Sequence, residues 1–192
     1  LAVKGSQSLD SEISSISFSE DRSKLLTTEK KGDVRLWGIS PNGKLISDEP
    51  VFEQDNFNLK HLESASFSPD GKYIATAGES GSFGNDEEIN LWDSESLTPK
   101  GSIPTNHRKI NSISFSRGGN YISTAGDDSV RIWNIKPNQI NSPIPIAEMK
   151  ADGVRKVSFS QWKDLELIAA VGDDGIVRVW QFFRGNSSQK PT

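Results

Sequence analysis

The chain has 192 residues and a formal net charge of −4, and 33% of its residues are hydrophobic. This length suffices for one domain with a substantial core, and the negative charge argues against a protein that binds nucleic acid by neutralising phosphates. The sequence has neither a basic block for an anionic membrane nor an apolar run of the roughly 18 residues that a membrane span requires. Because cysteine is absent, disulfides, thiolate nucleophiles and cysteine-ligated zinc are excluded.

The first residues, LAVKGSQSLD, lack a methionine and lack the charged and apolar regions of a signal peptide. We therefore expect a piece of a longer chain, or a processed product, and a cytoplasmic location.

One sequence pattern then occurs four times. Its copies are Ile13–Ile39, Leu62–Ser94, Ile110–Ile135 and Val154–Phe182. The phenylalanines that anchor the copies, Phe18, Phe67, Phe115 and Phe159, are 49, 48 and 44 residues apart. Four of the five tryptophans share one position near the end of each copy, which chance would not produce: Trp37, Trp92, Trp133 and Trp180. Self-similarity at such a period indicates a solenoid, a propeller or an array.

Each copy reads as a series of short strands. A strand with alternating apolar residues ends in Phe-Ser, and a turn follows, clearest as SPDG at Ser68–Gly71. A second apolar strand and a third strand that ends in tryptophan come next, and the third has apolar residues on both faces, as in a stack of sheets. A looser fourth strand is expected in each linker, at Leu45–Phe52, Leu97–Ile103 and Ile144–Met149. Prolines in two of these regions suit an edge strand, and the fourth copy ends before such a strand.

Four antiparallel strands in about 45 residues are typical of a propeller blade. With its stretches FSPDGKYIATAG, AGDDSVRIWN and LWD, the chain resembles the WD40-repeat family across residues 1–183, and bacterial arrays of the cyanobacterial type in particular. The resemblance implies an all-β fold with four blades of four-stranded antiparallel sheet. The repeats lie at about 1–39, 40–94, 95–135 and 136–183, and a disordered polar tail is expected at 184–192.

How the blades close is left open. Rings of this family usually have about seven blades, so these four are expected to belong to a larger ring. A ring of four, completed by an N-terminal outer strand at Leu1–Ser6, and a pairing of two copies into eight blades are the alternatives. An open arc would expose apolar faces and a sheet edge, so self-association through open blade edges is possible.

The acidic pairs in the later turns resemble catalytic carboxylates, but the family resemblance implies a structural role in a His–Ser/Thr–Asp–Trp network. Buried indole and imidazole N–H groups need acceptors. Only the third copy offers the full set, which is His107, Ser123 or Thr124, Asp127 or Asp128, and Trp133. The other copies offer partial sets, namely Asp174 with Trp180, Asp86 with Trp92, and Trp37 with Lys31 at the acidic position. The arginines two places before tryptophan, Arg35, Arg131 and Arg178, are expected to pack their stems between blades.

No motif for catalysis or cofactor binding is present. There is no G-x-S-x-G elbow, and GESGSFG is not a phosphate-binding loop because no Gly-Lys-Ser/Thr follows it. Two histidines without cysteine cannot make an ordinary closed zinc site. We therefore expect no enzymatic activity, no cofactor and no resident metal.

Two features are candidates for recognition. The turn in TAGESGSFGNDEEINLW is about six residues longer than that of the fourth copy, and Asp86 is assigned to its framework. A cation site, a partner site and a tolerated insertion are the possible interpretations, but the acids lack the spacing of a calcium loop. The candidate contacts with a partner are Glu79, Phe83, Glu87, Glu88 and, in the turn SQWKDLE, Trp162. Trp162 is equally compatible with a lid over the edge of its blade.

The resemblance implies a non-catalytic scaffold for protein–protein interactions, because rigid blades hold variable loops that carry recognition. The alternative is a regulatory or sensor module of a larger signalling or effector protein, and a propeller enzyme is the less favoured third class. Protein partners are expected, with no nucleic acid, no membrane and no small-molecule ligand.

Overall fold

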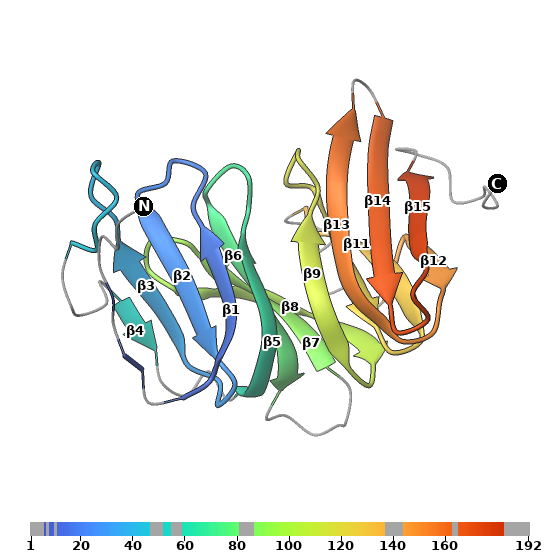
Figure 1. Cartoon of the computed structure of the whole chain (residues 1–192), viewed down its shortest axis with the longest axis horizontal. Coiled ribbons are helices and arrows are strands. Elements are labelled where there is room, and N and C mark those ends of the chain that lie inside the picture. The colour runs from blue at the N-terminus through green and yellow to red at the C-terminus, as the bar shows by residue number, and fades with distance from the viewer. Residues whose placement is uncertain are drawn as a thin grey trace.

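The computed structural model describes residues 6, 8–9, 11–46, 52–54, 59–80, 87–136, 144–162 and 165–182, with only the backbone at 52–54, 59–60, 79–80 and 162. This part of the chain contains fifteen β-strands and no helix, which confirms the all-β prediction. Within it, the structure accordingly has no helix that is long and apolar enough to span a bilayer. The strands form four antiparallel sheets that follow one another along the chain (Figure 1).

Each sheet is a blade in which the strands lie side by side in chain order. The first blade contains β1 (Ile13–Phe18), β2 (Lys24–Glu29), β3 (Val34–Gly38) and β4 (Phe52–Gln54). The second contains β5 (Leu59–Phe67), β6 (Tyr73–Ser80), β7 (Glu87–Asp93) and β8 (Pro99–His107). The third contains β9 (Ile110–Phe115), β10 (Tyr121–Gly126), β11 (Ser129–Asn134) and β12 (Ala147–Lys150). The fourth has three described strands, β13 (Val154–Trp162), β14 (Leu165–Gly172) and β15 (Val177–Phe182).

The turn between the first two strands of a blade follows from its sequence. Gly71 and Gly119 have φ angles of 71° and 67°, and their amides donate to the carbonyls of Ser68 and Ser116. Glycine takes this left-handed conformation without the steric cost that other residues have. The first blade makes the same turn with Arg22, at a φ of 60°.

The fourth strands begin later in the chain than the sequence predicts. They start at Phe52, Pro99 and Ala147, and pairing with the third strand fixes these positions, since Phe52 lies opposite Leu36. Leu45, where the first of them was expected to begin, instead forms an isolated bridge with Ile39. The prolines of β8 lie in an edge strand, as predicted.

The core of the protein lies between blades. Each blade presents one face with its tryptophan, here called the Trp face, and an opposite aliphatic face. Val34 and Leu36 of the first blade pack with Trp92 of the second, and Ile89 and Leu91 of the second pack with Trp133 of the third. Val130 and Ile132 of the third blade pack against the fourth blade, where Trp180 is partly buried. Both faces of β3, β7 and β11 are thus buried inside the stack, as predicted, whereas β15 of the fourth blade exposes Val177 and Val179 on one face.

The four blades form an open arc. Inner strands β1, β5, β9 and β13 contact one another in that order (Figure 1). Aliphatic and aromatic side chains are exposed on the first blade at Ile16 and Phe18, and on the fourth at Val177 and Val179. The first and fourth blades therefore do not pack together, and the structure does not show the ring of four. Of the N-terminal outer strand expected at Leu1–Ser6, only Ser6 is among the described residues, and the tail at 184–192 lies outside them.

Candidate functional site

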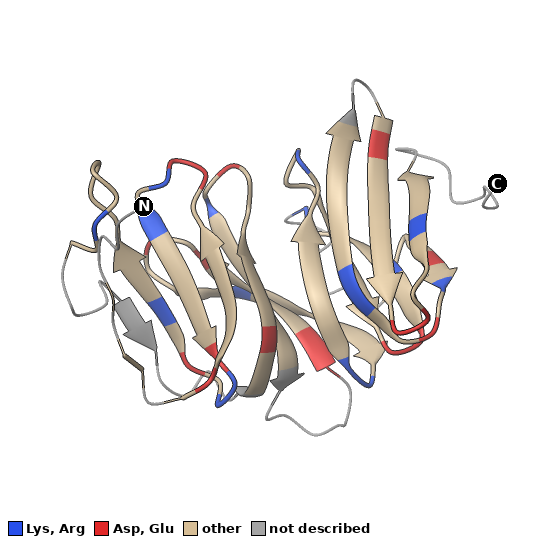
Figure 2. Cartoon of the chain, in the orientation of Figure 1, with Lys and Arg blue, Asp and Glu red and all other residues tan. Residues whose placement is uncertain are grey.

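The second strand of each blade ends, and the third begins, at one edge of the arc, here called the turn edge (the ends of β2, β6, β10 and β14; the lower edge in Figure 1). Ion pairs at this edge join carboxylates of the turns to nearby arginines, among them Arg108–Asp127, Arg155–Asp173 and Arg178–Asp174. Figure 2 shows the acidic turns of the third and fourth blades close together there. Charged groups of both signs therefore mark this surface.

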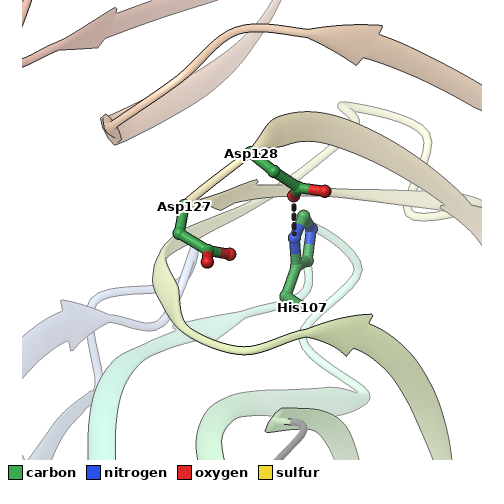
Figure 3. Close-up of side chains that lie close together, drawn as sticks. All are labelled: His107, Asp127 and Asp128. Carbon is green, nitrogen blue, oxygen red and sulfur yellow. Dashed lines mark hydrogen bonds and ion pairs between the residues drawn. The ribbon is translucent and has the colours of Figure 1, made fainter.

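A buried hydrogen-bond network underlies the turn edge in the third blade. The indole N–H of Trp133 donates to Thr124 Oγ1 at 3.0 Å, and Thr124 Oγ1 lies 3.0 Å from His107 Nε2. The other ring nitrogen, His107 Nδ1, lies 3.1 Å from Asp128 Oδ1 (Figure 3). The strand pattern brings these groups together, because Thr124 and Trp133 lie on one face of paired strands and β8 ends at His107.

The protonation of His107 follows from its partners. The indole only donates, so the Thr124 hydroxyl accepts from Trp133 and also lies within hydrogen-bond distance of Nε2, while Nδ1 lies between the carboxylate of Asp128 and the guanidinium of Arg131. Burial lowers the pKa of His107, and the Arg131 guanidinium, whose Nη1 lies 2.8 Å from Nδ1, lowers it further. The carboxylate of Asp128 opposes this effect only in part. His107 is therefore neutral in the folded protein at neutral pH.

Arg131 is a member of this network that the sequence reasoning missed. Its guanidinium reaches Asp128 Oδ2 at 2.9 Å and Glu148 Oε1 at 2.9 Å, and it donates to the carbonyl of Thr105. Burial raises the pKa of Asp128, but the hydrogen bond from Ser129 and the charge of Arg131 bring it below its ordinary value. From the sequence, only the stem of this arginine is expected to pack between blades. The alternation of the strand could have indicated the polar contacts as well, because it places Arg131 on the same face as Trp133.

The lowered pKa of His107 predicts a pH dependence of stability. Below the unfolded-state pKa of about 6.5, the unfolded chain binds a proton that the folded chain excludes, so the free energy of unfolding falls as the pH is lowered. The slope has an upper limit of about 1.4 kcal/mol per pH unit for one group. Urea titrations at pH 7.5 and at pH 5.5 should show this loss in the wild type and a smaller loss in His107→Gln. Equal losses in the two proteins would contradict the assignment of a neutral buried imidazole.

Gly126 provides the space that His107 occupies. A Cβ atom at position 126 would overlap the imidazole ring of His107. Gly126 ends β10 directly before the two-residue connection Asp127–Asp128, so its missing side chain lets the ring lie between strand and turn. The histidine and the glycine therefore form one packing unit.

The other blades retain only parts of the network. Trp37 donates to Thr27 Oγ1 at 2.8 Å and Trp92 donates to Thr76 Oγ1 at 3.0 Å, so the tryptophan–threonine bond occurs in three blades. In the fourth blade Ala170 lies opposite Arg178, which is the register position of Thr124 in the third blade, and alanine offers no hydroxyl to Trp180.

The first blade replaces the histidine by a buried ion pair. Glu29 takes the register position of Gly126, and its carboxylate pairs with Arg35, the counterpart of Arg131. Both side chains are buried, and Lys31 and Asp33 add a second pair, with Nζ and Oδ2 2.7 Å apart. A buried carboxylate needs such compensation. The prediction that Lys31 breaks the histidine type of network in this blade agrees with this geometry.

Three other residues predicted for the network, Ser123, Asp127 and Asp174, have hydrogen-bond partners other than His107. Ser123 points to the opposite face and donates to the carbonyl of Ser114, because neighbouring residues of a strand face opposite sides. Asp127 pairs with Arg108, and Asp174 pairs with Arg178 at the turn edge. Of the alternatives that the sequence left open, the structure thus places Thr124 and Asp128 beside His107. Asp86 lies outside the described residues.

His107, Asp127 and Asp128 are close enough for their ligand atoms to surround a cation (Figure 3). Each carboxylate, however, already faces a guanidinium, Asp127 that of Arg108 and Asp128 that of Arg131. An added cation would have to displace a positive charge. His107 is 0% exposed, so its imidazole also has no access to a substrate in solution. The cluster is suited to holding the turn in place.

The predicted partner contacts are placed unevenly. Glu87 was expected to project from the insertion, and this is wrong, because the side chain is buried and its carboxylate accepts the backbone N–H of Ile110. Glu88 is half-buried in β7. Glu79 and Trp162 have described backbone only, in β6 and at the end of β13 rather than within a turn, and Phe83 lies outside the described residues.

Comparison with known proteins adds the following findings. A family model described as "WD domain, G-beta repeat" matches residues 57–93, 98–134 and 144–181, which correspond to the second, third and fourth copies of the repeat. A comparison with curated protein sequences finds no match.

Among solved structures, the chain is similar to the WD40 repeats of RRP9, with 18% identity, a TM-score of 0.70, and coverage of 90% of this chain and 49% of that one. U3-55K is similar at 18% identity and a TM-score of 0.71, over 91% of this chain and 50% of that one. A chain of the mitotic checkpoint complex is similar at 15% identity and a TM-score of 0.68, over 92% and 51%. The chain thus spans about half the length of these solved chains. Because the sequence identity is low, the structural similarity shows the fold alone.

Proposed function

Because this chain belongs to the WD40-repeat family, we propose that it is a non-catalytic scaffold that binds protein partners through its turn edge. Propellers of this family generally serve as interaction scaffolds, and recognition by a rigid fold is carried by the loops that it holds in place. The partner is expected to be a protein, without nucleic acid, membrane or cofactor, and a cytoplasmic location stays a prediction.

The observation that carries this proposal is the unequal length of the turn-edge connections. Between the paired residues Ala77 and Ile89 the second blade has 11 residues, 78–88. Between Ala125 and Val130 the third blade has four, 126–129, and the first and fourth blades have five each, 29–33 and 172–176. The blade framework needs only four or five residues, so the additional ones are available for recognition.

The charge at the same edge supports this assignment. Arg155 and Asp173 form a two-pronged pair with distances of 2.8 and 2.7 Å, and both side chains are more than half exposed. Exposed ion pairs contribute little to stability, so such groups can exchange one partner for another at low cost. A protein surface with charges of both signs would complement them.

Enzymatic activity is not part of the proposal. His107, the histidine beside the carboxylates of the third-blade turn, is fully buried, and its acidic neighbours are paired with arginines. The alternative, a regulatory module of a larger signalling protein, would use the same surface and differs in what the binding event controls.

Removing residues 80–85 tests the proposal. The deletion leaves five residues between Ala77 and Ile89, the number found in the fourth blade, so the free energy of unfolding is expected to change by less than about 1 kcal/mol. Partners captured by cross-linking in the cells that produce the protein should be lost from the shortened chain. A chain that lacks residues 187–192 is the control for a deletion of equal size, and it should retain them.

The measured stability and the captured partners together distinguish recognition by this turn from a tolerated insertion. Unchanged stability with lost partners supports recognition by this turn. Unchanged stability with the same partners captured would overturn that assignment and leave the segment as a tolerated insertion.

A further inference from the structure

The interfaces between blades all join two different kinds of face. At each of the three interfaces the aliphatic face of one blade packs on the Trp face of the next. The Trp faces are built alike, with an apolar residue and a phenylalanine from the inner strand, as in Ala65 and Phe67 of the second blade. The order along the arc is therefore always aliphatic face to Trp face.

One face of each kind is left open at the ends of the arc. On the first blade the Trp face exposes Ile13, Ile16 and Phe18 by 42%, 64% and 58%, beside an apolar groove of about 480 Å³ that Trp37 also lines. On the fourth blade the aliphatic face exposes Val177 and Val179 by 70% and 61%. These are the two complementary halves of one more interface, and they lie on different ends of the same molecule (Figure 1).

Serines add directional hydrogen bonds to the internal interfaces. Ser17 Oγ accepts the amide of Phe67 at 3.4 Å, and Ser114 Oγ accepts the amide of Phe159 at 3.0 Å. Ser158 of the fourth blade occupies the position of these serines, one before the anchor phenylalanine, and is exposed. Phe18 of the first blade occupies the position of the phenylalanines whose amides are bound. The open ends thus carry the donor and the acceptor of the same contact.

The charges at the two ends are complementary as well. Across the interface of the second and third blades, Glu63 pairs with Lys109, with Oε1 and Nζ 3.3 Å apart. The position of Glu63 is occupied in the fourth blade by Arg155, and the position of Lys109 is occupied in the first blade by Glu12. Both side chains are at least half exposed, and in the single chain Arg155 pairs with Asp173 and Glu12 pairs with Lys30. The open ends therefore offer the same pair with the signs exchanged.

We propose that the open aliphatic face of the fourth blade binds the open Trp face of the first blade in a second copy of this chain. The same contact made twice closes a two-fold ring of eight blades, so neither of the two apolar faces stays exposed to solvent. Continuity with the three internal interfaces and the charge pair Arg155–Glu12 favour this occupant over an unrelated protein.

Sedimentation of the whole chain, with complementing variants, tests the ring. The wild type should have the mass of two copies at micromolar concentration. Ile16→Asp and Val179→Asp each place a charge in both interfaces, and each should weaken dimerisation at least 100-fold. An equimolar mixture of these two variants retains one intact interface, between the fourth blade of the Ile16→Asp chain and the first blade of the other, so dimers should reappear. Ile144→Asp, at an isoleucine 74% exposed outside both faces, should dimerise like the wild type.

Charge exchange gives a second test that does not depend on the apolar side chains. Glu12→Lys and Arg155→Glu should each weaken dimerisation, and a chain with both changes should recover it. A monomeric wild type would overturn the proposal, as would open oligomers larger than two copies. Failure of the equimolar mixture to dimerise would also overturn the proposal, because the mixture retains one intact contact between a fourth blade and a first blade.

Discussion

Replacing His107 with alanine is expected to lower the free energy of unfolding by about 3 kcal/mol, whereas replacing His61 with alanine should change it by less than about 0.5 kcal/mol. His107 is fully buried and bonds Thr124 and Asp128, so its removal leaves a cavity and takes one hydrogen-bond partner from each of these two residues. His61 has an exposed side chain. In a chain of this length the first change corresponds to a fall in Tm of about 6–12 °C.

Urea denaturation followed by tryptophan fluorescence measures both variants under the same conditions. Trp133 lies in the network, so its emission also reports whether local packing survives in the folded state of the His107 variant. Similar destabilisation by the two alanine substitutions would contradict a structural role for His107.

The sequence predicts the repeat frame because tryptophan and phenylalanine recur at fixed positions and strands alternate between two faces. That alternation also identifies the threonine of the network. Trp133 pairs with Ile122, and the residue two places further along β10, on the same face, is Thr124 and not Ser123. The choice between Asp127 and Asp128 depends on the length of the connection, and the longer turn of the fourth blade offers no guide to it.

Other features depend on contacts between strands, of the same blade or of neighbouring blades, which the repeat pattern does not show. Glu87 appears in the sequence as part of a polar insertion, yet β7 begins at this residue and the next blade supplies the amide of Ile110 to its carboxylate. Glu29 appears as an ordinary strand end, and only its pairing with Arg35 explains why a carboxylate is tolerated in the interior. Composition gives no sign of either partner, because both come from neighbouring elements in three dimensions.

Gly126→Ala is expected to destabilise the wild-type chain by about 3 kcal/mol, because the new methyl group overlaps the buried imidazole of His107 and must push it from its partners. The backbone itself is not the obstacle, since Gly126 is not among the glycines with positive φ. In the His107→Ala background the overlap is gone. There the same change should be neutral or stabilise slightly, because alanine reduces the freedom of the unfolded chain and fills part of the cavity.

The decisive quantity is the coupling between the two positions in a double-mutant cycle, which is expected to be about 2–3 kcal/mol. The four chains needed are the wild type, the two single variants and the double variant, each measured by urea denaturation at pH 7.5. A coupling near zero would mean that Gly126 serves the strand or the turn on its own account. The first blade already contains the alternative solution, since Glu29 occupies this position and bonds the counterpart of Arg131. A large coupling would therefore show that, in each blade, the residue tolerated at this position depends on the group that it faces at the turn edge.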